Sequence, residues 1–187
     1  FGQGPHPRPH KGANQQAQLR LTFDESINGI ETSVTAGTQS GATQSVKMRI
    51  PAGVEDEQRI RLKGKGSPGS HGGPSGDLIV IIRVTPHELF GRDEMNFTLQ
   101  LPVTFIEAAL GADIQVPTYP NGSVTLRLPA GTQTGSTFRV KGEGIKHEKT
   151  SGDLLVTVEI TVPQKLDKQQ EKALQELKDL FPGTPND

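Results

Sequence analysis

The side chains that could do chemistry in this 187-residue sequence are scattered, and only one glycine motif has a spacing associated with a reaction. The five histidines stand apart, without the paired spacing of zinc ligands. No Ser/His pair or acidic pair stands out as a nucleophile and its base. Cysteine is absent, which excludes disulfides, thiolate metal sites and a cysteine nucleophile. The sequence therefore predicts no enzymatic activity, no cofactor and no metal site.

The glycine motif is the stretch Gly64-Lys-Gly-Ser-Pro-Gly69, which matches the Gly-x-Gly-x-x-Gly pattern of dinucleotide-binding loops. That pattern holds phosphates only where a helix begins directly after the last glycine. Here Pro68, Pro74 and several further glycines up to Gly76 forbid such a helix. A mobile hairpin loop is therefore predicted in place of a nucleotide site.

The composition favours thin, turn-rich β domains over one compact enzyme body. Hydrophobic residues make up 32% and aromatic residues 4% of the chain, with 22 glycines and 14 prolines, which suits small cores and many short strands. The 20 basic and 21 acidic residues nearly balance, which argues against a nucleic-acid or anionic-membrane partner. The sequence has neither an apolar run of roughly 18 residues nor the apolar core of a signal peptide. A cytoplasmic location is expected, and the lack of an initiator Met suggests a fragment of a longer chain.

An internal repeat indicates one β-rich domain written twice. The matching segments are Val46–Gly53 with Val124–Gly131, Arg61–Gly66 with Arg139–Gly144, and Gly76–Val80 with Gly152–Val156. A looser upstream match sets Leu19, Leu21 and Phe23 against Phe97, Leu99 and Leu101. Because Asp77 and Asp153 begin the last strand of each copy, a shared structural role is favoured over a catalytic pair.

The repeat sets the predicted fold: mainly β, with two tandem homologous β-sandwich-like domains, each with one short helix, and a C-terminal amphipathic helix. Each copy is expected to run strand, short helix, two or three strands, glycine loop and final strand. The expected organisation is a flexible Gly/Pro linker over residues 1–13, a first domain over 14–88, a second domain over 89–164, and a helix with a tail over 165–187.

The segment after Pro163 predicts one amphipathic helix that needs a partner for its apolar side. Asp167 is the expected N-cap, and Pro182 ends the helix. About four turns are marginal for an isolated helix in water. The apolar stripe can pack on its own second domain or on a second copy of the chain. The residues that would serve dimerisation are Leu166, Ala173, Leu174, Leu177, Leu180 and Phe181.

The ordered set of motifs resembles the C-terminal region of DnaJ-type co-chaperones from residue 16 to residue 181. The motifs are a Pro-Ala-Gly turn, a Lys-Gly-x-Gly turn and a Gly-Asp-Leu strand in each copy, with His87-x-x-Phe90-x-Arg92-Asp93, Leu101–Gly111 and Val116-Pro-Thr118. The zinc-bearing members carry cysteine repeats where this chain has Thr35–Ser45, so the likeness is to the zinc-free, CbpA-like branch. The His-Pro-Asp triplet of a J domain does not occur in the sequence, so this stretch is expected to lack a J domain, and its N-terminal Gly/Pro segment resembles the linker that follows one.

The resemblance implies a client-binding module that passes unfolded or misfolded polypeptides to a DnaK-type chaperone, which it would meet mainly through the absent J domain. Clients would bind by β-augmentation, in which an extended peptide pairs with a free strand edge beside an apolar groove of the first domain. A homodimer would join two such grooves. The implied groove residues lie on three strands: Ala17, Leu19 and Leu21; Val34 and Ala36; Val80 and Ile82.

Two alternatives stay open. The seven groove residues also fit a plain hydrophobic core, above all Val80 and Ile82 in an unbroken apolar strand. The duplicated domain also fits a structural or adhesive β-repeat pair of a larger protein, although such repeats rarely end in an amphipathic helix.

In eukaryotic members of the family that the chain resembles, lysines beside the first-domain groove grip an acidic chaperone tail. The corresponding strand here, Glu31–Thr35, has no lysine, so the resemblance does not extend to tail binding.

Overall fold

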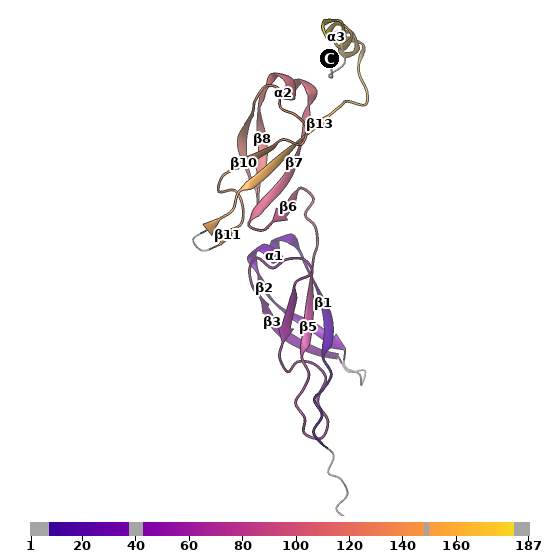
Figure 1. Ribbon diagram of the computed structural model, residues 1–187, viewed down its shortest axis with the longest axis vertical. Coiled ribbons are helices and arrows are strands. Elements are labelled where there is room, and N and C mark those ends of the chain that lie inside the picture. The colour runs from indigo at the N-terminus through magenta and orange to yellow at the C-terminus, as the bar shows by residue number, and fades with distance from the viewer. Residues whose placement is uncertain (1–7, 38–42, 148–149, 182–187) are drawn as a thin grey trace, which may run out of the picture. The chain divides into compact units, whose positions relative to one another are not determined.

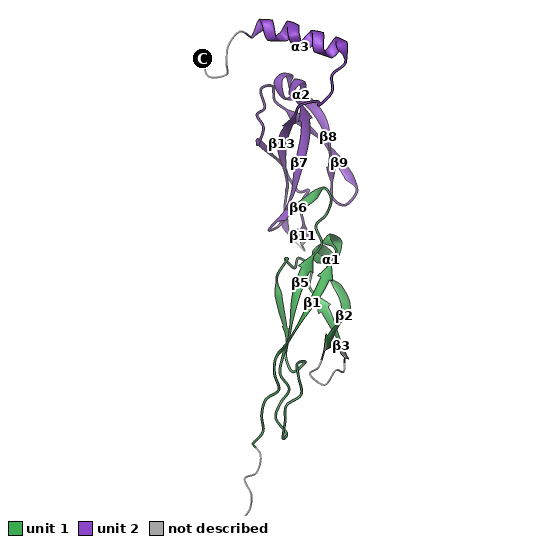
Figure 2. Cartoon of the chain, turned by 90° about the vertical axis from the view of Figure 1, so that its right-hand side faces the viewer, with its two compact units in different colours: residues 1–91 green, residues 92–187 purple. Residues whose placement is uncertain are grey.

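The computed structural model describes residues 8–37, 43–147 and 150–181. The chain forms two compact units, residues 1–91 and 92–187 (Figure 2). Each unit is built from β-strands with one short helix, and a longer helix follows the strands of the second (Figure 1). The predicted fold class is thereby confirmed. No helix in these described ranges has the length and apolar run of a membrane span.

The first unit packs two small sheets against each other. Its strands are β1 (Gln15–Leu21), β2 (Ile30–Gly37), β3 (Thr43–Ile50), β4 (Arg59–Leu62) and β5 (Leu78–Val84). One sheet has the order β1-β5-β4, with β1 parallel and β4 antiparallel to β5, and the other is the antiparallel pair β2-β3. Inward side chains from both sheets share one core, in which Ile50, Val80 and Ile82 have at most 1% of their surface exposed.

The second unit repeats this plan. Its strands are β6 (Phe90–Asp93), which starts at the boundary, β7 (Asn96–Thr104), β8 (Ala112–Thr118), β9 (Gly122–Leu128), β10 (Thr137–Val140), β11 (Lys146–His147), β12 (Thr150–Ser151) and β13 (Leu154–Thr161). β7 is parallel to β13 as β1 is to β5, and β10 is antiparallel to β13 as β4 is to β5. The pair β8-β9 corresponds to β2-β3. β6 adds a fourth strand to the larger sheet.

Matching capping boxes begin the two short helices, α1 (Phe23–Asn28) and α2 (Phe105–Leu110). The Thr22 hydroxyl accepts a hydrogen bond from the Glu25 N–H, and the Glu25 carboxylate accepts one from the Thr22 N–H. Thr104 and its glutamate three residues later repeat the pair of bonds. The short helix predicted after the first strand of each copy is therefore present in both units, and side-chain hydrogen bonds fix its start.

The capping boxes correct the looser part of the repeat alignment. Because Thr22 is equivalent to Thr104, Leu19 corresponds to Leu101 and not to Phe97, a difference of four positions. Phe23 is the first residue of α1 and does not continue β1. The sequence match was wrong because a period-two apolar pattern fits itself equally well after a shift by an even number of residues.

The paired aspartates have the structural role that the repeat predicted. The Asp77 carboxylate accepts a hydrogen bond from the Gly64 N–H at 2.9 Å and pairs with the Arg61 guanidinium. Asp153 makes the same two contacts with the equivalent glycine and arginine of the second unit. The backbone N–H, and with it the guanidinium, holds the pKa of each carboxyl below its ordinary value. Each aspartate thus ties a glycine turn to the start of the unit's last strand.

The C-terminal helix α3 (Lys168–Leu180) begins where the sequence predicted. The Asp167 carboxylate accepts a hydrogen bond from the Gln170 N–H at 2.8 Å, and the Gln170 side chain accepts one from the Asp167 N–H. None of the helix residues is buried. The helix is therefore held by its cap and its own hydrogen bonds and not by packing against described parts of this chain.

Candidate peptide-binding site

The seven predicted groove residues lie together on the inward faces of β1, β2 and β5, but they differ sharply in exposure. Ala17 and Leu19 on β1 are half-buried at the rim of the core. The other five have between 0% and 3% of their surface exposed and belong to the core itself: Leu21, Val34, Ala36, Val80 and Ile82. Of the seven predicted groove residues, only Ala17 and Leu19 therefore present surface that a ligand could reach.

The strand order explains why Val80 and Ile82 on β5 are buried while Ala17 and Leu19 on β1 are not. In the parallel pair, Ala17 stands opposite Val80 and Leu19 opposite Ile82. β5 is the middle strand of its sheet, so its inward side chains are covered from both sides, whereas β1 is an outer strand. Val80 and Ile82 are therefore covered, and the rim consists of Ala17 and Leu19 on β1, whereas Leu21 on the same strand belongs to the core.

Four strand edges of the first unit are free among the described residues, and two of them, on β1 and β2, concern the predicted groove. Among the described residues, the edge of β1 away from β5 and the edge of β2 away from β3 pair with no strand. Both strands belong to sheets that face each other across the same core (Figure 1). A free edge presents unpaired N–H and C=O groups that an extended chain can satisfy. The half-buried Ala17 and Leu19 thus lie next to backbone that can bind a peptide.

The second unit carries a larger side chain at one of the two rim positions. Leu99 stands where the first unit has Ala17, and it has 5% of its surface exposed. Leu101 stands where the first unit has Leu19, and it has 8% exposed. The extra three carbons of leucine over alanine close the rim in the second unit, so the opening is specific to the first.

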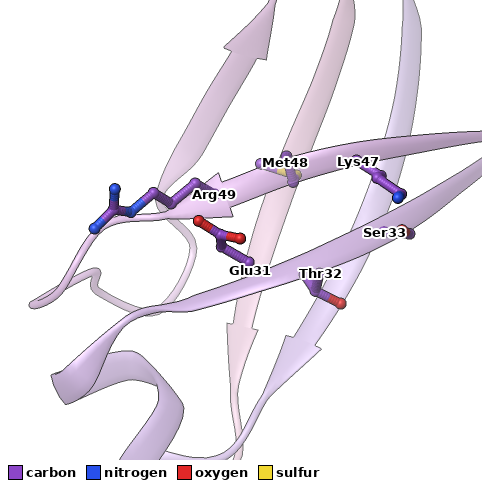
Figure 3. Close-up of a pocket in the computed structure, with 6 residues that line it drawn as sticks. All are labelled: Glu31, Thr32, Ser33, Lys47, Met48 and Arg49. Atoms are coloured by element: carbon purple, nitrogen blue, oxygen red, sulfur yellow. The ribbon is translucent and has the colours of Figure 1, made fainter.

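A separate hollow that sequence reasoning missed lies on the outward side of β2 and β3 (Figure 3). It has a volume of about 470 Å³ and is lined by Glu31, Thr32, Ser33, Lys47, Met48 and Arg49. Glu31 faces Arg49 across the strand pair, and Ser33 faces Lys47. None of the seven predicted groove residues lines it. The alternation of charged and apolar residues along Val46–Ile50 was the available signal, because it assigns Lys47 and Arg49 to the solvent side.

The predicted dimerisation residues are almost all accessible. Leu166 and Leu174 have 42% and 40% of their surface exposed, Leu180 has 75% and Phe181 has 72%. Ala173 is exposed and Leu177 is half-buried. A second apolar surface, not predicted from the sequence, lies on α2 and comprises Phe105, Ile106 and Leu110, which are 50%, 60% and 75% exposed.

His87 packs against neighbouring rings and belongs to no metal-type cluster among the described residues. Within the described part of the chain, no three His, Asp or Glu side chains gather in a way that could hold a metal ion. His87 packs its ring against the rings of Phe23 and Phe90, with centroids 5.4 Å and 5.3 Å away. Its Nδ1 accepts hydrogen bonds from the N–H groups of Leu89, at 3.1 Å, and Phe90, at 3.3 Å. The His87-x-x-Phe90 motif is thus a packed turn.

Comparison with known proteins gives a family. Residues 15–163 match the DnaJ C terminal domain. Chaperone protein DnaJ 2 of Cutibacterium acnes is 55% identical over 146 residues, which are 77% of this chain and 38% of that protein. Chaperone protein DnaJ 1 of Streptomyces coelicolor is 53% identical over 135 residues, which are 72% of this chain and 34% of that protein. The chain spans less than two fifths of the length of these relatives. It belongs to the DnaJ C-terminal domain family.

Proposed function

We propose that this chain is the client-binding part of a DnaJ-type co-chaperone, a family without enzymatic activity of its own. It holds unfolded or misfolded polypeptides in the first unit, over residues 14–88. The observation that carries the proposal is the pair of free edges on β1 and β2 beside the half-buried Ala17 and Leu19. A surface of this kind offers backbone hydrogen bonds together with an apolar contact, and neither depends on the sequence of the client.

The client strand adds to the outer edge of β2. The sheet β2-β3 has only two strands, so the outer edge of β2 pairs with no described strand. A third strand supplied by the client satisfies the alternate N–H and C=O groups of β2 that point away from β3. Side chains on the inward face of that client strand then meet Leu19 and the space above Ala17. The backbone thus supplies most of the recognition and the rim selects for apolar side chains.

Affinity for a single client segment is low. Burying one Leu or Phe side chain of the client stabilises the complex by about 1.5–3 kcal/mol, and ordering the extended peptide opposes this. Weak, sequence-tolerant binding suits a protein that must release its client to a partner chaperone. In the proposed pathway that partner is DnaK-type, it is met through a J domain, and the encounter takes place in the cytoplasm.

The test is a fluorescence anisotropy titration of a labelled, hydrophobic, unfolded peptide with the full chain. Saturable binding with a dissociation constant in the micromolar range or weaker is expected, competed by a second unlabelled apolar peptide. A glycine- and serine-rich peptide of equal length serves as the control and should not compete. Equal binding of both peptides, or no saturation, would overturn the proposal.

The chain is also proposed to represent the zinc-free, CbpA-like form of the family. Thr35–Ser45, the stretch where the zinc-bearing members carry their cysteine repeats, contains no cysteine, and neither does any other part of the chain. Strands β2 and β3 flank this stretch and pair along their whole length, although residues 38–42 themselves lie outside the described ranges. The cysteine-free sequence of this hairpin is what supports the assignment to the zinc-free form.

We further propose that the chain is a homodimer held by its C-terminal part, residues 165–187. α3 carries an apolar stripe with no buried residue, and α2 carries Phe105, Ile106 and Leu110 in the open. Two unpartnered apolar surfaces on one chain are complementary to the same two surfaces on a second copy, and a two-fold axis would cover both at once. Two client grooves joined in this way raise the avidity for a long unfolded chain.

Replacing the apolar stripe of α3 should give a monomer. We expect sedimentation equilibrium to report twice the 20.1 kDa chain mass for the unaltered protein and a single chain mass for Leu174→Ser/Leu177→Ser. The matched control is Lys172→Ser/Gln175→Ser, which has the same spacing on the polar side of the helix and should stay dimeric. A dimer that survives the first double variant would refute this interface.

A further inference from the structure

The glycine loop between β4 and β5 is not a free hairpin. Its two arms run side by side with the segment that precedes β1, as both views of the first unit show (Figures 1 and 2). We call residues 10–14 the strap, and residues 66–70 and 73–77 the first and second arms of the loop. The sequence placed residues 1–13 in a flexible linker; within the described ranges, His10 to Ala13 are hydrogen-bonded to the loop.

The strap bonds to both arms through its backbone. Toward the first arm, His10 and Ser70 exchange two N–H···O=C bonds of 3.0 Å, and the Ser67 N–H donates to the Ala13 carbonyl at 3.0 Å. Toward the second arm, the Gly12 N–H donates to the Pro74 carbonyl at 2.9 Å. The arms also bond to each other, because the Gly76 N–H donates to the Ser67 carbonyl at 2.9 Å. Three backbone segments thus hold one another pairwise.

The glycines are needed at the places where these backbones meet. A Cβ on Gly12 would overlap the Ser67 carbonyl, one on Gly73 would overlap His10, and one on Gly76 would overlap the Ala13 carbonyl. Within each arm two such glycines stand three residues apart, at 66 and 69 and at 73 and 76. A three-residue spacing places every third residue of an extended polyproline-II-like chain on one side, and glycine is the residue that fits a crowded axis between three chains.

Side chains fix the inner end of the strap. The Asn14 side-chain oxygen accepts a hydrogen bond from the Asp77 N–H at 2.9 Å, and the Gln15 N–H donates to the Asp77 carbonyl at 2.8 Å. Lys11 lies 3.8 Å from the Asp77 carboxylate. The strap therefore enters β1 in register with β5, and Asp77 joins the strap, the glycine turn at Gly64 and the last strand of the unit.

We propose that the loop is a docking site for the strap, one that recognises an extended, glycine-bearing backbone as the third chain of a glycine bundle. This assigns a role to the Gly-x-Gly-x-x-Gly stretch that neither a nucleotide nor a free turn explains. Docking carries the segment before β1 along the loop, toward its turn at Ser70, and away from the free edges of β1 and β2. The protein's own segment before β1 is thereby kept from pairing with the edges at which a client would bind.

The test is amide hydrogen exchange by NMR on the full chain and on Gly12→Ala, whose added Cβ meets the Ser67 carbonyl. In the unaltered protein the amides of His10, Gly12 and Ser67 should exchange slowly. In Gly12→Ala they should exchange at least about tenfold faster, while the amides of β5 keep their protection. Unchanged protection of the strap in Gly12→Ala would overturn the proposal.

Two further variants keep the test decisive. Gly73→Ala places its Cβ against His10 at the outer end of the strap, and it should release the same amides even if Gly12→Ala unfolds the whole unit. Gly72→Asn is the matched control, because a Cβ there meets nothing within 4 Å and asparagine tolerates the φ of +79°. Strap exchange in Gly73→Ala that equals the exchange in Gly72→Asn would refute the docking site.

Discussion

Closing the rim of the first unit should abolish client binding without loss of the fold. Ala17→Leu gives the first unit the side chain that the second unit has at Leu99, where the rim is filled. Because the inward face of β1 at Ala17 is only half-buried, the added carbons extend into the opening and not into the core. They occupy the space that a Leu or Phe of the client would take, so we expect the dissociation constant for the unfolded peptide to rise roughly 10- to 100-fold.

Leu19→Ser should weaken binding by the opposite change. It removes the apolar wall that the client contacts and replaces it with a hydroxyl group that favours water. The matched control for both variants is Gln18→Ser, between them on the solvent face of β1, which should bind the peptide like the unaltered protein. Thermal unfolding checks that all three are folded. Full affinity in both Ala17→Leu and Leu19→Ser would place the client elsewhere.

Ile82→Ala should show the reverse pattern, a large loss of stability with peptide affinity retained. Ile82 has 0% of its surface exposed and stands opposite Leu19 in the register of β1 and β5. Truncating a buried isoleucine to alanine costs about 2–5 kcal/mol in free energy of unfolding, through lost burial and the cavity left behind. Because no client can reach this side chain, the folded fraction should bind the peptide within about twofold of the unaltered affinity.

Urea denaturation and anisotropy together check this expectation. Ile81→Ala is the control. Ile81 directly precedes Ile82 in β5, points to the other face of the sheet and is half-buried, so truncating it should cost less free energy of unfolding. A loss of peptide affinity in Ile82→Ala as large as that in Leu19→Ser, at temperatures where both are folded, would mean that β5 contacts the client directly.

Most of the fold that could be predicted from the sequence followed from the internal repeat. Two copies of one motif order define two equivalent units, and the unbroken apolar strand expected over Leu78–Val84 is a core strand in the structure. The capping pair of Thr22 and Glu25 was visible in the sequence and would have fixed the register of the repeat. The parallel pairing of β1 with β5 was not predictable locally, because the residues between the two strands, 22–77, contain no signal for it.

The candidate site could be predicted only in part, for a related reason. A period-two pattern tells which side of a strand faces inward, but not whether that side is covered. Leu19 and Leu21 have the same side-chain chemistry and the same face, yet Leu21 is 3% exposed and Leu19 lies at the rim. Because both lie on β1, their strand alone does not separate them; the difference depends on which parts of the chain, distant in sequence, cover each side chain. The strap was missed for a like reason, since a Gly/Pro-rich segment has no apolar pattern to reveal backbone pairing.

The most direct measurement of the central claim is amide hydrogen exchange in the presence of saturating unfolded peptide, resolved by residue. We expect slower exchange at alternate amides of β2, those that point away from β3, because the client strand accepts their hydrogen bonds. The equivalent amides of β8 in the second unit should exchange as they do without peptide. Protection that appears on β8 or α2 and leaves β2 unchanged would contradict the account.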